Sequence, residues 1–142
     1  MSGYSVTIAP RILAGLRREA GLTGPAECCG ALIGLMHSTE IEIRTLIPVA
    51  NSARDHSSFL IDAPTVLRLE RQAGCAGMQV VGFYHSHPTT SAEPSPTDLD
   101  LAVPGYVYVI IDVPRGSVRC WRLRDDRSGF AELPVSMLAG AA

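Results

Sequence analysis

The 142-residue chain contains no lysine, because all 12 of its basic residues are arginines. It therefore offers no lysine amine as an acceptor for an isopeptide bond. Charged residues make up only 18% of the chain, the formal net charge is −2, and no basic cluster or block of like charges is present. This balance argues against a nucleic acid or an acidic membrane surface as the main partner.

Long uncharged segments are also missing. The uncharged run over residues 28–39 is too short to span a membrane, and the run over residues 73–92 is interrupted by glycine, proline and two histidines. The first residues, MSGYSVTIAP, lack the basic and apolar regions of a secretory signal. We therefore expect a cytoplasmic protein with no membrane segment, in a compartment where thiols stay reduced.

No pair of cysteines has C-x-x-C spacing, which excludes a zinc-ribbon or thioredoxin-like motif. Apolar residues, by contrast, make up 46% of the chain. A chain of this length and composition can bury a stable core without disulfide bonds. Since no internal repeat or linker interrupts it, we expect a single globular domain over residues 1–142.

The hydrophobic pattern predicts strands that alternate with helices. The apolar run CGALIGLM, residues 29–36, indicates a buried strand, and the partly alternating residues 40–49 indicate a more exposed strand paired with it. We expect helices over residues 10–20, 63–73 (ended by Gly74) and 95–103. Further strands are expected over residues 4–8, 58–61, 79–85, 106–113, 118–124 and 130–135, and a frayed tail over residues 139–142. This order favours an α/β or α+β sheet flanked by helices.

The segment HSHPTTSAEPSPTD, residues 85–98, carries the candidate chemistry. Side chains two positions apart on a strand share a face, so His85 and His87 can direct both imidazoles at one site. Ser95 followed by proline is typical of a helix start, which places Asp98 in the first turn, where its carboxylate can face the strand end. Two histidines and one carboxylate leave one position of a tetrahedral zinc ion open, as in catalytic rather than structural sites.

Each of these residues also has a simpler structural explanation. An acid in the first helical turn, such as Asp98, stabilises the helix dipole, and Ser95 suits an N-cap. A single histidine is usually an ordinary core or surface residue, and we place His37 and His56 in that group. Two histidines at this spacing, followed by a helix-opening aspartate, are far less ordinary, so we favour a metal site.

The same segment resembles the signature of the JAMM metallopeptidases, also called the MPN or Mov34 family. The family motif is H-S-H-P-x6-S-x2-D, and it is matched at every position by His85, Ser86, His87, Pro88, Ser95 and Asp98. The family also carries an upstream glutamate before an apolar strand, and Glu27 in ECCGALIG is similar to it. The resemblance covers residues 25–123. The chain departs from the family at Ala31, where a larger aliphatic is common, and at Phe83, where tryptophan is frequent.

The resemblance implies a role for each matching residue. His85, His87 and Asp98 would bind one zinc ion per chain. Glu27 would act as general acid/base, taking a proton from zinc-activated water and passing it to the leaving amine, and Ser95 would donate a hydrogen bond near the developing oxyanion. The implied fold is an αβα sandwich around a mixed, largely antiparallel sheet, similar to cytidine deaminases. The implied enzyme is a zinc metallopeptidase that hydrolyses a peptide or isopeptide amide.

The chain resembles the short, stand-alone prokaryotic members of the family, which process small ubiquitin-like sulfur carriers. The resemblance therefore implies that the substrate is the C-terminal tail of a ubiquitin-like or sulfur-carrier protein, cleaved after its C-terminal glycine. Such a tail would bind as an extended segment, by addition to a sheet edge.

Three other functions are weighed against this one. A non-catalytic MPN scaffold would not need an intact set of metal ligands. A cysteine hydrolase would use Cys28 or Cys29, but their small apolar neighbours indicate packed strand residues. A zinc nucleobase deaminase needs H-x-E and P-C-x-x-C motifs, and neither occurs here.

Overall fold

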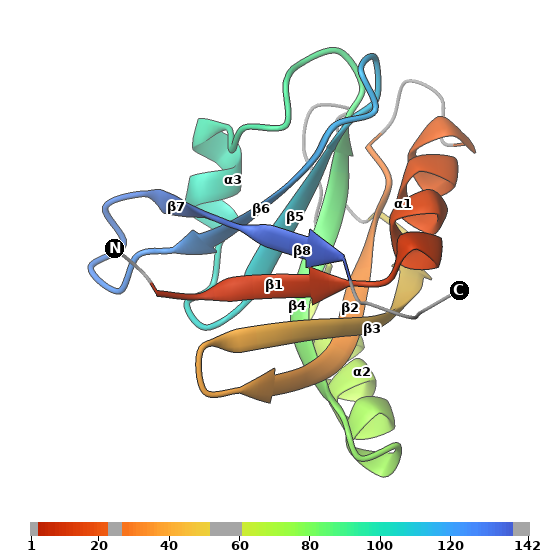
Figure 1. Ribbon diagram of the computed structural model, residues 1–142, viewed down its shortest axis with the longest axis vertical. Coiled ribbons are helices and arrows are strands. Elements are labelled where there is room, and N and C mark those ends of the chain that lie inside the picture. Colours follow the sequence, from red (N-terminus) through yellow and green to blue (C-terminus); the bar gives the residue numbers. More distant parts are fainter. Residues whose placement is uncertain (1–2, 23–26, 52–60, 138–142) are drawn as a thin grey trace.

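The computed structural model describes residues 3–22, 27–51 and 61–137. Over these ranges it confirms a mixed α+β fold (Figure 1). Its elements in chain order are β1 (Ser5–Ile8), α1 (Pro10–Leu22), β2 (Cys29–His37), β3 (Glu40–Val49), α2 (Ala63–Cys75), β4 (Gln79–His87), α3 (Pro96–Leu101), β5 (Val107–Asp112), β6 (Val118–Leu123), β7 (Phe130–Leu133) and β8 (Val135–Met137). His56, residues 58–60 of the short strand expected from the sequence, and the tail over residues 139–142 lie outside the described residues.

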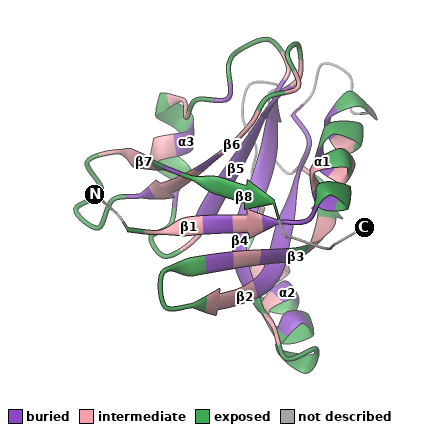
Figure 2. Ribbon diagram, in the orientation of Figure 1, coloured by how far each residue is buried: buried purple, intermediate pink, exposed green. Residues whose placement is uncertain are grey.

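The described strands form one sheet in the order β7-β6-β5-β4-β2-β3-β1-β8. β1 pairs in parallel with β3 and β8, and β4 pairs in parallel with β5. The other neighbours are antiparallel, so the sheet is mixed and largely antiparallel, as the family resemblance implies. The central strands β2, β4 and β5 are almost wholly buried, whereas β8 is exposed (Figure 2).

The C-terminal strand was expected to run unbroken over residues 130–135, and this prediction was wrong. Pro134 separates β7 from β8, and these two strands pair at opposite edges of the sheet. Proline has no N–H to donate to a ladder, but the Pro134 carbonyl accepts a hydrogen bond from the Val6 N–H at 2.9 Å. Since a single residue joins the two edge strands, the sheet curls until its edges meet, as the nearly continuous blue ribbon of Figure 1 shows.

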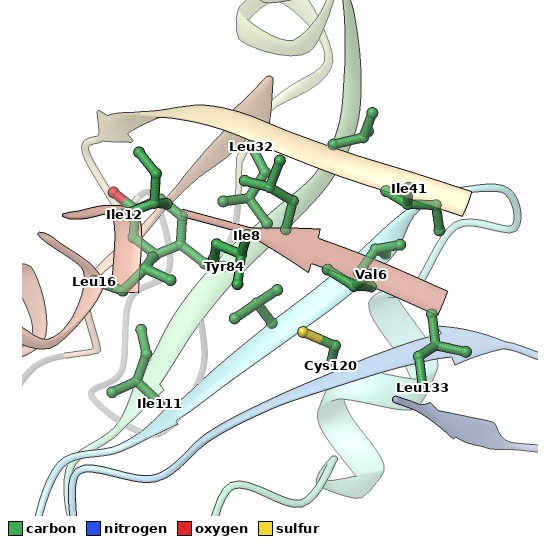
Figure 3. Close-up of a cluster of buried hydrophobic side chains, with 14 of the residues drawn as sticks. Val6, Ile8, Ile12, Leu16, Leu32, Ile41, Tyr84, Ile111, Cys120 and Leu133 are labelled. Atoms are coloured by element: carbon green, nitrogen blue, oxygen red, sulfur yellow. The ribbon is translucent and has the colours of Figure 1, made fainter. Parts of the chain in front are cut away.

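Helices cover both faces of this sheet. α1 packs on one face, here called the α1 face, where Ile12 and Leu16 join a large apolar cluster (Figure 3). α2 packs on the other, the α2 face, where Leu69 and Ala73 contact a second apolar cluster with Leu99 of α3 against it. The result is an αβα sandwich in which each helix buries one apolar stripe.

Three predicted boundaries needed correction. α2 passes Gly74 and is capped at Ala76, and the left-handed residue that follows is Gly77, with φ 72°. α3 ends at Leu101, earlier than expected, because Val103 precedes a proline and is thereby biased away from helical dihedrals. β4 continues to His87 rather than ending at His85, because β5 pairs with it from Gly82 to His87.

Gly30 on β2 occupies a position that has no room for a side chain. It lies opposite Tyr84 of β4. A Cβ at Gly30 would overlap both the Tyr84 ring and the Ile47 carbonyl oxygen. Glycine at this position therefore leaves room for the buried Tyr84 ring against β2, next to the strand end that carries the histidines.

Candidate metal centre and active site

β4 brings the two histidines of the motif to the same face of the sheet. His85 is fully buried and His87 is 5% exposed. In the neighbouring strands, Cys29 and Ile110 flank His85. Asp112 lies beside His87, but its carboxylate accepts hydrogen bonds from the Arg115 N–H and guanidinium instead of facing the imidazole pair.

Asp98, the third residue of the cluster, lies on α3. Ser95 is the N-cap, and its Oγ accepts a hydrogen bond from the Asp98 N–H at 3.0 Å. In return the Ser95 N–H donates to Asp98 Oδ2 at 2.8 Å, which completes a capping box. The N-cap role of Ser95 and the place of Asp98 in the first turn are thus confirmed, and the capping box points the buried Asp98 carboxylate at the histidines.

The ligand atoms of His85 and His87 converge on the Asp98 carboxylate, and each histidine contacts a different oxygen of it. The two Nε2 atoms are 3.2 Å apart, His85 Nε2 is 3.1 Å from Asp98 Oδ1, and His87 Nε2 is 3.2 Å from Asp98 Oδ2. Donors that share a tetrahedral zinc ion lie about 3.3 Å from one another. The observed separations therefore match a set of metal ligands.

The tautomer of His87 also indicates a metal site. Its Nδ1 lies 2.7 Å from the Ser91 carbonyl oxygen, which can only accept, so Nδ1 carries the proton. In the neutral ring the Nε2 lone pair then faces both His85 Nε2 and the Asp98 carboxylate. Such converging acceptors repel one another unless a proton or a cation lies between them. A backbone carbonyl that fixes the tautomer in this way is the usual support of a metal-binding histidine.

The pKa values describe a site that keeps a negative charge available. Burial raises the pKa of Asp98, but hydrogen bonds with His85 and His87 outweigh it and hold that pKa far below its usual range. Burial lowers the pKa of His85 despite the nearby carboxylate. For His87, burial acts in the same direction, but the hydrogen bonds to Asp98 and Ser91 reverse it and raise the pKa. An ionised carboxylate beside two imidazoles suits a divalent cation.

Glu27 lies at the edge of this cluster, just before β2. It is only 4% exposed. Among the described residues, ligand atoms of Glu27, His85 and His87 lie within 4.8 Å of one another. These atoms are close enough to share a metal ion, so Glu27 lies directly beside the imidazole pair. Asn51 Nδ2 donates to the Glu27 carbonyl oxygen at 3.1 Å and helps to fix the segment.

Ser86 has a function that the sequence did not reveal. It lies between the two histidines and points to the opposite side of β4. Its Oγ accepts a hydrogen bond from the Cys28 N–H at 2.8 Å, and its N–H donates to the Cys28 carbonyl at 3.1 Å. This double contact ties the residue after Glu27 to the histidine strand. Only its place inside the motif could have indicated such a role.

The vicinal cysteines are not arranged as nucleophiles. Cys28 packs into the cluster on the α1 face and Cys29 into the cluster on the α2 face. Burial raises the pKa of Cys28 and raises that of Cys29 to about 12. A catalytic thiol needs the opposite shift, so the cysteine-hydrolase alternative loses its support.

The fold and this cluster of imidazoles and carboxylates define the class of metal-binding hydrolases. Within the described ranges, no helix is long and apolar enough to cross a membrane. The family described as "Prokaryotic homologs of the JAB domain" matches residues 10–124. The chain therefore belongs to the prokaryotic JAB-domain family of hydrolytic, JAMM-type peptidases, which confirms the resemblance stated above.

Two characterised relatives are similar over nearly their whole length. The desampylase of Haloferax volcanii is 35% identical over 128 residues, which cover 89% of this chain and 88% of the relative. The CysO-cysteine peptidase of Mycobacterium tuberculosis is 31% identical over 139 residues, which cover 95% of this chain and 92% of the relative. Both names describe hydrolytic enzymes rather than scaffolds.

Solved structures agree on the fold. A protein of Desulfitobacterium hafniense has a TM-score of 0.86 at 24% identity, with 96% of this chain and 94% of that one covered. A JAB1/MPN domain protein of Archaeoglobus fulgidus has a TM-score of 0.59 at 25% identity, with 94% and 100% covered.

Proposed function

We propose that the chain is a zinc-dependent isopeptidase in which His85, His87 and Asp98 hold the metal. The observation that carries this proposal is the convergence of the two Nε2 atoms, 3.2 Å apart, on the Asp98 carboxylate, whose two oxygens lie 3.1 and 3.2 Å from them. Two imidazoles with one carboxylate form a set that zinc accepts, and they leave a fourth position open. When bound, the ion supplies Lewis-acid chemistry: it lowers the pKa of a coordinated water and polarises a carbonyl group.

In this proposal the chain's own residues move the protons. Glu27 accepts a proton from the attacking water and passes it to the leaving amine, a transfer for which its buried place beside the histidines is suited. Ser95 accepts from the Asp98 N–H through its Oγ lone pair, so its O–H hydrogen can still be donated. We assign that hydrogen to the substrate carbonyl oxygen as negative charge develops.

The proposed substrate is the C-terminal tail of a small ubiquitin-like or sulfur-carrier protein, cleaved after its terminal glycine. The names of the two relatives, a desampylase and a CysO-cysteine peptidase, support this substrate class. The proposal includes a single domain over residues 1–142, supported by the one continuous sheet of the described residues. It also includes a cytoplasmic location, supported by four cysteines that form no disulfide.

The test is mass spectrometry of carrier proteins extended at the C-terminal glycine, before and after incubation with zinc-loaded enzyme. We expect release of the extension, loss of release with a chelator, and recovery when zinc is restored. Asp98→Ala removes the carboxylate that both histidines contact and should reduce both bound zinc and cleavage to background. Stoichiometric zinc with no cleavage of any extended carrier would refute the substrate class, and a purified chain that takes up no zinc would point to a scaffold instead.

A further inference from the structure

The segment between His87 and Ser95 is the only covalent link between the strand that carries the histidines and the helix that carries Asp98. It is held at three points. The Ser91 carbonyl accepts from His87 Nδ1 at 2.7 Å. The Ala92 carbonyl accepts from the indole N–H of Trp121 at 2.9 Å. Glu93 forms an exposed ion pair with Arg119 at 3.3 Å. We call residues 88–94 the connecting loop.

The contact with Trp121 differs from the exposed ion pair, because it satisfies a buried group. Ala92 is 1% exposed although it lies in a loop. A buried carbonyl without a hydrogen-bond partner destabilises the conformation that buries it. The indole N–H is a donor with no acceptor capacity, so it is matched to a carbonyl. Trp121 thus stabilises the one conformation in which Ala92 points inward.

The Trp121 ring is itself fixed in place. β6 pairs with β5 and β7, which puts Trp121 between Tyr108 and Glu132. The Arg119 guanidinium stacks over the ring at 4.7 Å, and Glu132 holds that guanidinium with two hydrogen bonds of 2.8 and 2.7 Å. The indole therefore presents its N–H to the connecting loop from a strand that is paired on both sides.

We propose that Trp121 is a positioning residue for the metal centre: its indole N–H fixes the connecting loop and thereby sets the placement of both Ser91 and Asp98. The Ser91 carbonyl next to Ala92 determines which nitrogen of His87 carries the proton. The far end of the loop is Ser95, whose capping box aims the Asp98 carboxylate. Trp121 touches none of the converging atoms itself. This inference rests on the proposed function, since it takes His87 and Asp98 as metal ligands.

The test uses the fact that Trp121 is the single tryptophan of the chain. Replacing tryptophan by β-(3-benzothienyl)alanine in a tryptophan auxotroph exchanges the indole N–H for sulfur at this position alone and keeps the shape of the ring. Trp121→Phe is a second variant. For both we expect zinc affinity, measured by competition with a chromophoric chelator, to fall about tenfold, the lower end of the effect of changing residues that orient metal ligands.

A second readout needs no metal. Hydrogen exchange of the amides in the connecting loop should be faster in the benzothienyl protein than in the parent, both without zinc. The matched control is Tyr106→Phe, which removes a half-buried side-chain hydrogen bond of 2.9 Å to Glu70 on the same face of the sheet, away from the loop. We expect this control to leave loop exchange and zinc affinity at parental values.

The inference is overturned if zinc affinity or loop exchange of the benzothienyl protein equals that of the parent. A lower melting temperature with both readouts unchanged would mean that Trp121 only stabilises the fold. If Trp121→Phe fails to fold, the benzothienyl protein decides, because its ring packs as the indole does. A parent that binds no zinc refutes the proposed function. The exchange experiment shows separately whether Trp121 holds the loop.

Discussion

The two faces of the sheet are built from the same strands but bury different groups. The described cluster on the α1 face is made of aliphatic side chains with Cys28, Cys120 and Tyr84. The α2 face carries a smaller apolar cluster, and at the end of β4 it also buries His85, His87 and Asp98. One face is thus a core, and the other is a core interrupted by a polar site.

This difference shows how the fold accommodates buried ionisable groups. Three of these groups have a local support: Ser91 for His87, the capping box for Asp98, and Arg115 for Asp112. Burying charge without such partners is costly. We therefore expect substitutions on the α2 face near the site to change chemistry, and substitutions on the α1 face to change stability.

Glu27→Gln should have the largest effect on catalysis among variants that keep the metal. The amide cannot accept the water's proton, so we expect kcat to fall by about 10²–10⁴-fold while zinc content, measured by atomic absorption, stays parental. Glu40→Gln, which changes an exposed acid at the turn between β2 and β3, is the control and should cleave normally. Cleavage by Glu27→Gln at the parental rate would show that the proton acceptor is another group.

Ser95→Ala should have the next largest effect on kcat. Removing a hydrogen-bond donor to a developing oxyanion typically lowers kcat by about 10²–10³-fold. Losing the N-cap should also lower the free energy of unfolding by about 0.5–2 kcal/mol. Ser95→Thr keeps the hydroxyl and should restore most of both. Steady-state kinetics and urea unfolding separate the two effects, and an unchanged kcat in Ser95→Ala would exclude the oxyanion role.

Leu16→Ala tests the other face. Leu16 is fully buried in the α1-face cluster. Truncating such a leucine should lower the free energy of unfolding by about 2–5 kcal/mol, with kcat and zinc content unchanged at temperatures where the variant is folded. Leu67→Ala on α2, 54% exposed, should change stability by no more than about 0.5 kcal/mol. A large loss of kcat in folded Leu16→Ala would mean that the two faces are not separable.

Alkylation of the thiols should have the smallest effect on hydrolysis. Burial raises the pKa of Cys29 and of Cys120 to about 12. At pH 8 their reactive thiolate fraction is then only about 10⁻⁴, and it increases as pH rises toward the pKa. Iodoacetamide should label the exposed Cys75 at pH 8, seen by peptide mapping, and hydrolysis should persist. Inactivation that tracks labelling of Cys28 or Cys29 would revive the cysteine-hydrolase alternative.

The sequence predicted the elements whose signals are local. The strand over residues 29–36 is marked by a continuous apolar run, and the helix start at Ser95 by its cap and proline. Both were found, as was the direction of His85 and His87 to one face. These features depend on periodicity and short spacing, which a single sequence contains.

Features that depend on distant pairing could not be predicted. Nothing local shows that residues on either side of Pro134 pair at opposite edges of the sheet. The same holds for Trp121, which is separated from Ala92 by 29 positions. The Ser86 contact with Cys28 spans 58 positions and also becomes visible only when β2 and β4 lie together. The candidate site residues could be predicted from the sequence, whereas the contacts that hold them in place required the fold.

The most direct test of the central claim is a crystal structure of the zinc-loaded protein with anomalous diffraction data at the zinc edge. We predict one strong anomalous peak at about 2.0–2.2 Å from His85 Nε2, His87 Nε2 and an Asp98 oxygen. Crystals soaked in zinc that show no peak among these three side chains, or a peak held by other residues, would contradict it.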